Sequence, residues 1–221
     1  MRHLLFVFAA VALAACGSAV DKPAAATPVV YGESVVLSAP DASRTTSVVE
    51  ALRNRRSSRD YSAEALSLEE LSGVMWAAAG QNREDGHLTA PSALALYPIR
   101  VYAFFADGVY LYDSASHTLN RVAVGDCRRL TGMQPFVETA PLNLVYVADT
   151  GVYDGRNIPA EHVRYLCGQD AAGYAANVSL YNAAAGLKSV VRGSFDADAL
   201  LTLLNLDPQT HFVALAQSVG K

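Results

Sequence analysis

The chain has 221 residues, of which 52% are hydrophobic and 17% charged, and its formal net charge at pH 7 is −4. A general nucleic-acid-binding protein needs a basic surface, so this acidic balance argues against that class of function. Beyond residue 15 the four histidines are scattered, and no CxxC, HxH or HExxH motif is present. We therefore expect no metal site.

The first fifteen residues are typical of a secretory signal peptide. Basic Arg2 precedes an apolar run at 4–13, and small residues follow it. The run is too short to span a bilayer, which requires about 20 apolar residues. Leu13-Ala14-Ala15-Cys16 resembles a bacterial lipobox, in which cleavage leaves Cys16 as the lipidated first residue. An ordinary signal peptide with an incidental cysteine is the alternative.

Residues 16–43 are rich in Ala, Pro, Ser and Val, a composition that predicts a flexible tether. Gly17 follows the cysteine where an aspartate would indicate retention in the inner membrane. We therefore expect a periplasmic, lipid-anchored protein and favour the outer membrane. Residues 44–221, about 180 in number, are enough for one domain with a hydrophobic core.

Two helices are predicted at the start of this domain. Ser47-Val48-Val49-Glu50 is a capping-box pattern for a helix that runs to about Arg56. Ser67-Leu68-Glu69-Glu70 is a second capping box, and Gly80 is the expected end of that helix. The following segment, 81–95, has the composition of a loop.

The rest of the domain mixes strands and helices. Asp107-Gly108 between two apolar runs predicts a hairpin with strands at 101–105 and 109–112. A long helix over about 160–185 is dense in small residues, which allow another helix or subunit to approach closely. The other predicted elements are strands at 142–148, 187–191 and 212–216 and a short helix at 196–204. Because these elements do not alternate as βαβ units, the predicted class is α+β.

A cluster of donors follows the first predicted helix. Arg55, Arg56, Ser57, Ser58 and Arg59 place three guanidiniums and two hydroxyls in five positions. A guanidinium offers a planar fork of donors that matches phosphate oxygens. The cluster is therefore a candidate anion site, and a solvated basic helix end is the alternative.

The order Arg-Arg-Ser-x-Arg-x-aromatic at 55–61, followed by Pro-Ser-Ala at 91–93, resembles the FMN-binding signature of the nitroreductase-like flavoprotein family. The segments 170–187, 190–196 and 216–220 are similar to later parts of that family. The resemblance is nearest to the branch of the peptide azoline dehydrogenases. It implies a central mixed or antiparallel sheet flanked by helices, a long central helix and an intertwined homodimer.

The resemblance also implies roles for the basic residues. Arg55, Arg56 and Ser57 are expected at the phosphate and ribityl end of FMN. Arg59 is the candidate cation near N1 and O2, where reduced flavin carries negative charge. Lys221 is the possible remnant of a basic tail that reaches the phosphate in relatives.

Two loops are expected at the flavin ring. Pro91, Ser92 and Ala93 are implied at the ring edge, and Gly193 and Ser194 are implied to offer backbone N–H groups to N5 and O4. In family members the Pro-Ser-Ala loop and the arginines come from different chains of the dimer. We therefore expect a single chain to hold half of each site.

The function that the resemblance implies is an FMN-dependent oxidoreductase. It would transfer hydride by a ping-pong cycle to or from a small-molecule or peptide-like substrate, with no catalytic side chain because the cofactor carries the chemistry. The alternative is a flavin-free relative that acts as a dimeric binding or scaffold lipoprotein. His87-Leu88, where relatives carry a basic pair, and the chain end at Lys221 favour that alternative. The substrate, the electron donor and the pairing of Cys127 with Cys167 stay open.

Overall fold

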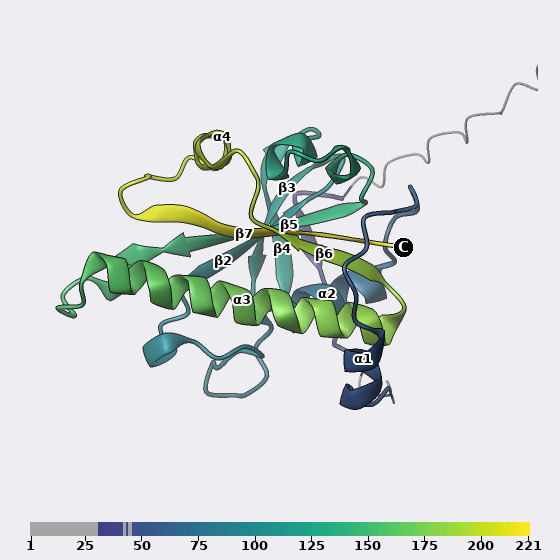
Figure 1. The fold of residues 1–221 in the computed structure, drawn as a ribbon, viewed down its shortest axis with the longest axis horizontal. Helices are drawn as coiled ribbons and strands as arrows, with labels where there is room; N and C mark the ends of the chain where they lie inside the picture. The colour runs from purple at the N-terminus through teal and green to yellow at the C-terminus, as the bar shows by residue number, and fades with distance from the viewer. Residues whose placement is uncertain (1–30, 42, 44–45) are drawn as a thin grey trace, which may run out of the picture.

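The computed structural model describes residues 31–41, 43 and 46–221, so the predicted signal peptide and Cys16 lie outside the described residues. The centre of the fold is a seven-stranded sheet in the order β1-β4-β3-β2-β5-β7-β6, with every neighbouring pair antiparallel (Figure 1). The strands are β1 Ser34–Val36, β2 Ile99–Phe104, β3 Gly108–Asp113, β4 Thr118–Val124, β5 Leu142–Asp149, β6 Lys188–Arg192 and β7 His211–Gly220.

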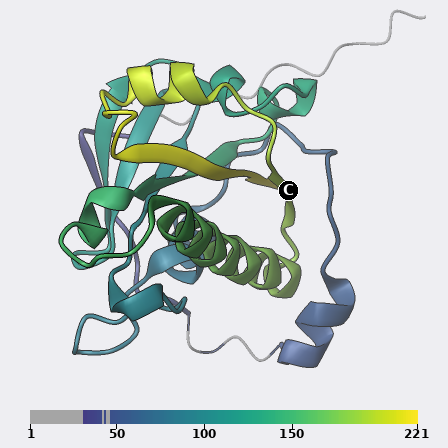
Figure 2. The ribbon, with the colours of Figure 1, turned by 60° about the vertical axis from the view of Figure 1, so that its left-hand side comes forward.

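Helices cover both faces of this sheet. The long helix α3 crosses one face together with α2, and α4 lies over the other face (Figure 2). The helices are α1 Val48–Asn54, α2 Leu68–Ala79, α3 Ala160–Ala185 and α4 Ala197–Leu203, and the 3-10 turns are η1 Ala93–Ala95, η2 Arg128–Thr131, η3 Pro135–Val137 and η4 Thr150–Tyr153. The fold is thus α+β, as predicted.

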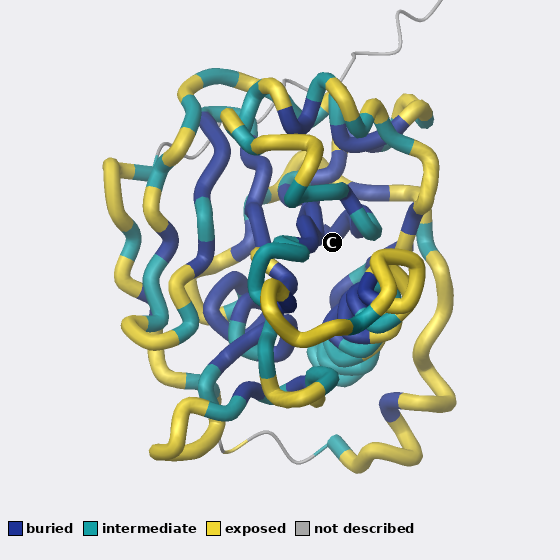
Figure 3. The backbone as a smooth tube through the Cα atoms, turned by 90° about the vertical axis from the view of Figure 1, so that its left-hand side faces the viewer, coloured by how far each residue is buried: buried dark blue, intermediate teal, exposed yellow. Residues whose placement is uncertain are grey.

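The central strand β5 is buried on both faces because its side chains alternate between two cores. Leu144 and Tyr146 pack with α2 and α3, while Val145 and Val147 pack with α4. In Figure 3 the central strands are accordingly mostly buried and the connecting loops mostly exposed. A near-continuous apolar run, without polar alternation, is the expected pattern for such a strand.

Most predicted elements are confirmed. Ser67 and Glu70 form a complete capping box at α2, and Gly186 ends α3 in the left-handed conformation, with φ 74°. The hairpin of β2 and β3 closes with a bond from the Phe105 N–H to the Gly108 carbonyl. Helix α1, however, ends at Asn54, two residues earlier than expected.

The predicted tether of residues 16–43 contains folded structure. Strand β1 pairs with β4, and neither strand is among the predicted elements. Leu37 is buried in the α2–α3 core, and the Tyr31 N–H donates to Asp107 Oδ2 at 2.7 Å. The boundary at residue 43 is therefore too late, because 31–37 completes the sheet.

The two cysteines lie on opposite faces of the sheet. Cys167 of α3 is buried in the α2–α3 core, and Cys127 packs against the α4 core. Both thiols are free. None of the helices in the described part of the chain has the length and apolarity to cross a bilayer.

We predict that Leu37→Ala lowers the free energy of unfolding by about 2–3 kcal/mol, because it leaves a cavity in the core. Val36→Ala is the matched control, since Val36 is 72% exposed, and it should cost less than about 0.5 kcal/mol. Urea unfolding of both variants measures this difference. Equal stability of the two variants would show that Leu37 contributes nothing to the core.

Candidate functional site

The arginine segment runs along the open edge of the sheet. Arg55 caps α1, and the chain then extends beside β6, the last strand in the sheet order. Ser57 forms a parallel bridge with Ser189, and the Ser58 N–H donates to the Ser189 carbonyl at 3.0 Å. The basic residue in the last turn of α1 is Arg53, outside the motif. The motif therefore follows the helix end and borders a strand.

The motif side chains are exposed and unpaired. Arg55, Arg56, Ser57 and Arg59 form no side-chain hydrogen bond or ion pair with any residue the structure describes. Cations that a fold leaves without carboxylate partners are free to bind an external anion.

A cleft of about 400 Å³ lies between this segment, β6 and the end of α3. Its walls include Arg56, Ser58, Lys188 and, from α3, Ser179. Lys188 is partly occupied, because its Nζ donates to the Asp60 carbonyl at 2.8 Å. Arg55 and Arg59 lie outside the cleft walls. Arg56 is thus the motif arginine that faces a built recess.

The predicted N–H donors lie at the same sheet edge. Gly193 and Ser194 directly follow β6 and are exposed. In the described structure the backbone N–H groups of residues 193–195 donate no hydrogen bond, and a Cβ added at Gly193 would meet nothing within 4 Å. Gly193 lies four positions after Ser189 along the strand, a distance of about 13 Å. The edge therefore offers cations at one end and free amide donors at the other.

The Pro-Ser-Ala loop is organised by a buried carboxylate of α3. The Ser92 hydroxyl donates to Asp170 Oδ2 at 2.6 Å, and the Ala93 N–H donates to Asp170 Oδ1 at 3.2 Å. Ser92 Oγ also accepts from the Tyr97 N–H at 2.8 Å. The Ser92 hydroxyl is therefore occupied within the chain. This gives Ser92 an ordering role within the chain, and the contact of Pro91, Ser92 and Ala93 with a ring edge stays a prediction.

This loop is strained. Leu94, Ala95 and Tyr97 have φ values of 57°, 54° and 48°, a region that non-glycine residues rarely adopt. Such strain costs about 1–3 kcal/mol per residue and persists where surrounding contacts impose it, often at functional sites. Asp170 holds Ser92, and Ser92 in turn accepts from the N–H groups of Ala95 and Tyr97. No pattern in the sequence signals this role of Asp170 or the strained residues.

The chain does not bring its two predicted half-sites together. Asp170 holds the Pro-Ser-Ala loop, whereas Ser179 lines the arginine cleft. Ser179 lies nine positions after Asp170, which corresponds to about 14 Å along the helix.

Lys221 is not a free cation in this structure. Its Nζ lies 2.6 Å from Glu64 Oε1 and 3.2 Å from Glu70 Oε2, and these partners raise the pKa of Lys221. Its carbonyl accepts from the Ser62 N–H. This arrangement ties the chain end to the start of α2 and opposes the predicted phosphate contact.

The departure at His87-Leu88 also has a structural reason. Leu88 is 9% exposed and belongs to the α2–α3 core, so it occupies an apolar position. His87 Nδ1 lies 2.8 Å from Asp85 Oδ1. Neither residue contributes a cation to the β6 edge.

The donor set at the β6 edge fits FMN. Free guanidiniums and a hydroxyl suit its phosphate, and free amide N–H groups suit the polar edge of its ring. Arg56 at the cleft and the exposed amides of Gly193 and Ser194 are the residues that best meet these needs.

Comparison with known proteins gives a consistent answer. Residues 52–221 match the family model of the nitroreductases. A protein of Methanocaldococcus jannaschii named as a nitroreductase is 32% identical over 171 residues, which are 71% of this chain and 83% of that protein.

Solved structures are similar as well. A crystal structure from Ralstonia eutropha, named as a nitroreductase, has a TM-score of 0.81 and 34% identity, covering 88% of this chain and 92% of that one. A structure from Desulfovibrio desulfuricans in complex with FMN has a TM-score of 0.56 and 25% identity, covering 78% and 84%.

We predict that Ser92→Ala lowers the free energy of unfolding by about 2–3 kcal/mol, because it removes a hydrogen bond to a buried carboxylate. Ser194→Ala, at an exposed serine without a hydrogen bond, should change it by less than about 0.5 kcal/mol. Thermal and urea unfolding without ligand compare the two. A Ser92→Ala variant as stable as the control would contradict the ordering role of the Ser92–Asp170 pair.

Proposed function

Because the chain belongs to the nitroreductase family, we propose that it is an FMN-dependent oxidoreductase. It would transfer hydride in a ping-pong cycle to or from a small-molecule or peptide-like substrate. The observation that carries the proposal is that unpaired cations and free amide donors both lie along one edge of β6. The FMN complex of the Desulfovibrio desulfuricans structure supports the choice of cofactor.

The basic end of the edge would hold the phosphate. Arg56 reaches the cleft, and Arg55 and Ser57 flank it without internal partners. Each charge-assisted hydrogen bond contributes about 1.5–3 kcal/mol. Arg59, also unpaired, is the candidate cation for the part of the ring that becomes negative on reduction. These residues bind and orient the cofactor.

The other end would receive the ring. FMN, when bound, supplies the chemistry of accepting and donating hydride. The backbone N–H groups of Gly193 and Ser194 would donate hydrogen bonds where negative charge develops, and they need no reorganisation to do so. The absence of a Cβ at Gly193 leaves room for close approach.

A homodimer would complete each site. The outward face of α3 carries Ala172, Gly173 and Ala176, which are exposed or half-buried, and the middle of α3 lies uncovered at the front of Figure 1. Helix α1 exposes Val48 and Leu52 by 70% and 55%. Within one chain the Pro-Ser-Ala loop and the arginine edge lie apart along α3. A second copy that covers these surfaces would bring its own Pro-Ser-Ala loop to the arginine edge.

The cellular location is also a proposal. The signal-peptide and lipobox patterns at 1–16 support a periplasmic protein with a lipid anchor, more in keeping with the outer than the inner membrane. Nicotinamide nucleotides are mostly cytoplasmic, so a different electron donor suits this location. The proximity to the azoline-dehydrogenase branch stays a prediction, and it is the reason for including peptide-like substrates.

A flavin-free binding or scaffold protein is the second candidate. The pairing of Lys221 with Glu64 and Glu70 removes one expected phosphate contact and favours this alternative. The unpaired arginines oppose it. The absorption spectrum of the purified protein separates the two candidates. A colourless preparation that takes up no added FMN would contradict the proposal of an FMN-dependent enzyme.

We predict that Arg56→Ala weakens FMN binding at least tenfold, because it removes one charge-assisted hydrogen bond of about 1.5 kcal/mol or more. Arg83→Ala is the control, since Arg83 is an exposed arginine outside this cleft. Fluorescence titration of FMN measures both. Identical curves for the two variants would reject the phosphate assignment.

We further predict that Ala176→Glu produces a monomer that no longer binds FMN, because it places a charge on the outward face of α3. Light scattering with a parallel FMN titration tests this. Glu161→Gln, at the exposed start of α3, is the control and should stay dimeric. A wild-type monomer at high concentration, or a dimeric Ala176→Glu variant, would contradict the proposed interface.

A further inference from the structure

Arg192, the last residue of β6, carries a buried guanidinium that is 6% exposed. Its Nη1 donates to the Thr131 carbonyl, and its Nη2 donates to Asn143 Oδ1 at 3.0 Å. The Phe136 ring centre lies 6.0 Å from Cζ. Among the residues that the structure describes, no carboxylate pairs with this cation, and Nε has no hydrogen-bond partner.

Burial of this guanidinium is costly for the fold. Burial lowers the pKa of Arg192 to about 10, so the side chain is still a cation at neutral pH. Removing a charge from water costs several kcal/mol, and an apolar residue of similar volume is often equally or more stabilising. An apolar side chain at this position could not donate the hydrogen bonds that Arg192 forms with the Thr131 carbonyl and Asn143 Oδ1.

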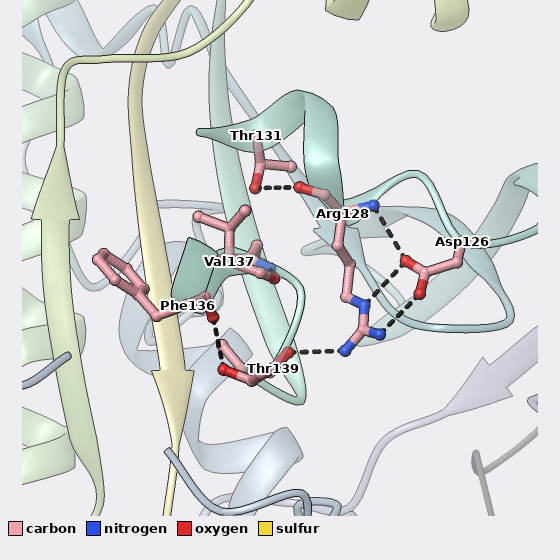
Figure 4. Close-up of polar contacts among 8 residues, drawn as sticks. Asp126, Arg128, Thr131, Phe136, Val137 and Thr139 are labelled. Atoms are coloured by element: carbon pink, nitrogen blue, oxygen red, sulfur yellow. Dashed lines mark hydrogen bonds and ion pairs between the residues drawn. The ribbon is translucent and has the colours of Figure 1, made fainter. Parts of the chain in front are cut away.

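The main partner of Arg192 is held firmly in place. Arg128 Nε and Nη2 bind Asp126 at 2.9 and 2.6 Å, and its Nη1 donates to the Ala140 carbonyl at 2.9 Å (Figure 4). The Thr131 hydroxyl donates to the Arg128 carbonyl at 2.7 Å. The η2 segment is thus a rigid support for the guanidinium.

The second partner is equally constrained, and space is reserved for the contact. Asn143 Oδ1 accepts from Ser218 Oγ at 2.5 Å, and Asn143 Nδ2 donates to the Val137 carbonyl at 2.8 Å. A Cβ added at Gly132 would overlap Arg192 Nη1. Since the Gly132 φ is −178°, glycine is required there for space and not for conformation.

Two contacts to η2 bracket the exposed loop after β6. Before the loop, Arg192 binds the Thr131 carbonyl, and after it the Asp196 N–H donates to the Leu130 carbonyl at 3.3 Å. We propose that Arg192 is a positioning residue that fixes the direction of the free N–H groups of residues 193–195. The identity of the ligand that these amides would bind rests on the proposed function. Their rigidity does not depend on it.

Backbone relaxation measured by NMR on the ligand-free protein tests the rigidity. In the wild type we expect order parameters near the rigid-backbone value of about 0.85 at 193–195. Arg192→Met and Gly132→Ala should lower them below about 0.6, and Arg192→Lys should give an intermediate value. Gly132→Ala retains the charge of Arg192 but displaces its guanidinium. It therefore tests the same inference if the Arg192→Met variant fails to fold. Arg83→Met, remote and exposed, is the control.

A second measurement uses FMN in both redox states. In the variants, the loss of aligned donors should weaken the binding of reduced FMN at least tenfold more than the binding of oxidised FMN. The reason is that the negative charge that the amides stabilise develops on reduction. Equal weakening of both states would indicate a merely structural role and overturn the inference. Unchanged order parameters in folded Gly132→Ala and Arg192→Lys would overturn it too. A wild type that binds no FMN would instead reject the proposed function, and the relaxation data would still decide the role of Arg192.

Discussion

The pairing of one short extended segment with the open edge of β6 is the constraint on which the site depends. The hydrogen bond from the Ser58 N–H to the Ser189 carbonyl places the exposed arginines beside a strand whose other end leads into Gly193 and Ser194. Without that pairing, the cations would belong to a loose connection between α1 and α2. With it, unsatisfied donors of two kinds share one edge of the sheet, at a separation of about 13 Å.

Buried polar residues hold the parts of this site that lie outside regular structure. Asp170 orders the Pro-Ser-Ala loop through Ser92 and Ala93, next to three left-handed residues. Arg192 and Asn143 join β5, β6 and the η2 segment beneath the loop that follows β6. In both places a buried polar group forms hydrogen bonds that direct the backbone, and the exposed surface is left with free donors.

The sequence predicted the elements whose signals are local. Capping boxes, the Asp-Gly turn and Gly186 define α2, the hairpin and the end of α3 because each acts through its nearest neighbours. Strand β1 lies in a segment with tether-like composition, and its existence depends on pairing with β4 far along the chain. The ion pairs of Lys221 with Glu64 and Glu70 likewise arise from long-range folding, and no local pattern in the sequence predicts them. Arg192 was placed in a flavin-facing segment, but its burial depends on Thr131 and Asn143, which no spacing rule connects to it.

The most direct test of the account is a crystal structure of the protein with FMN. We predict the phosphate within hydrogen-bond distance of Arg56 in the cleft beside β6, and the ring edge against the amides of Gly193 and Ser194, with the Pro-Ser-Ala loop of a second copy completing the site. Flavin bound at another surface, with the guanidiniums of residues 55–59 still in solvent, would contradict the account.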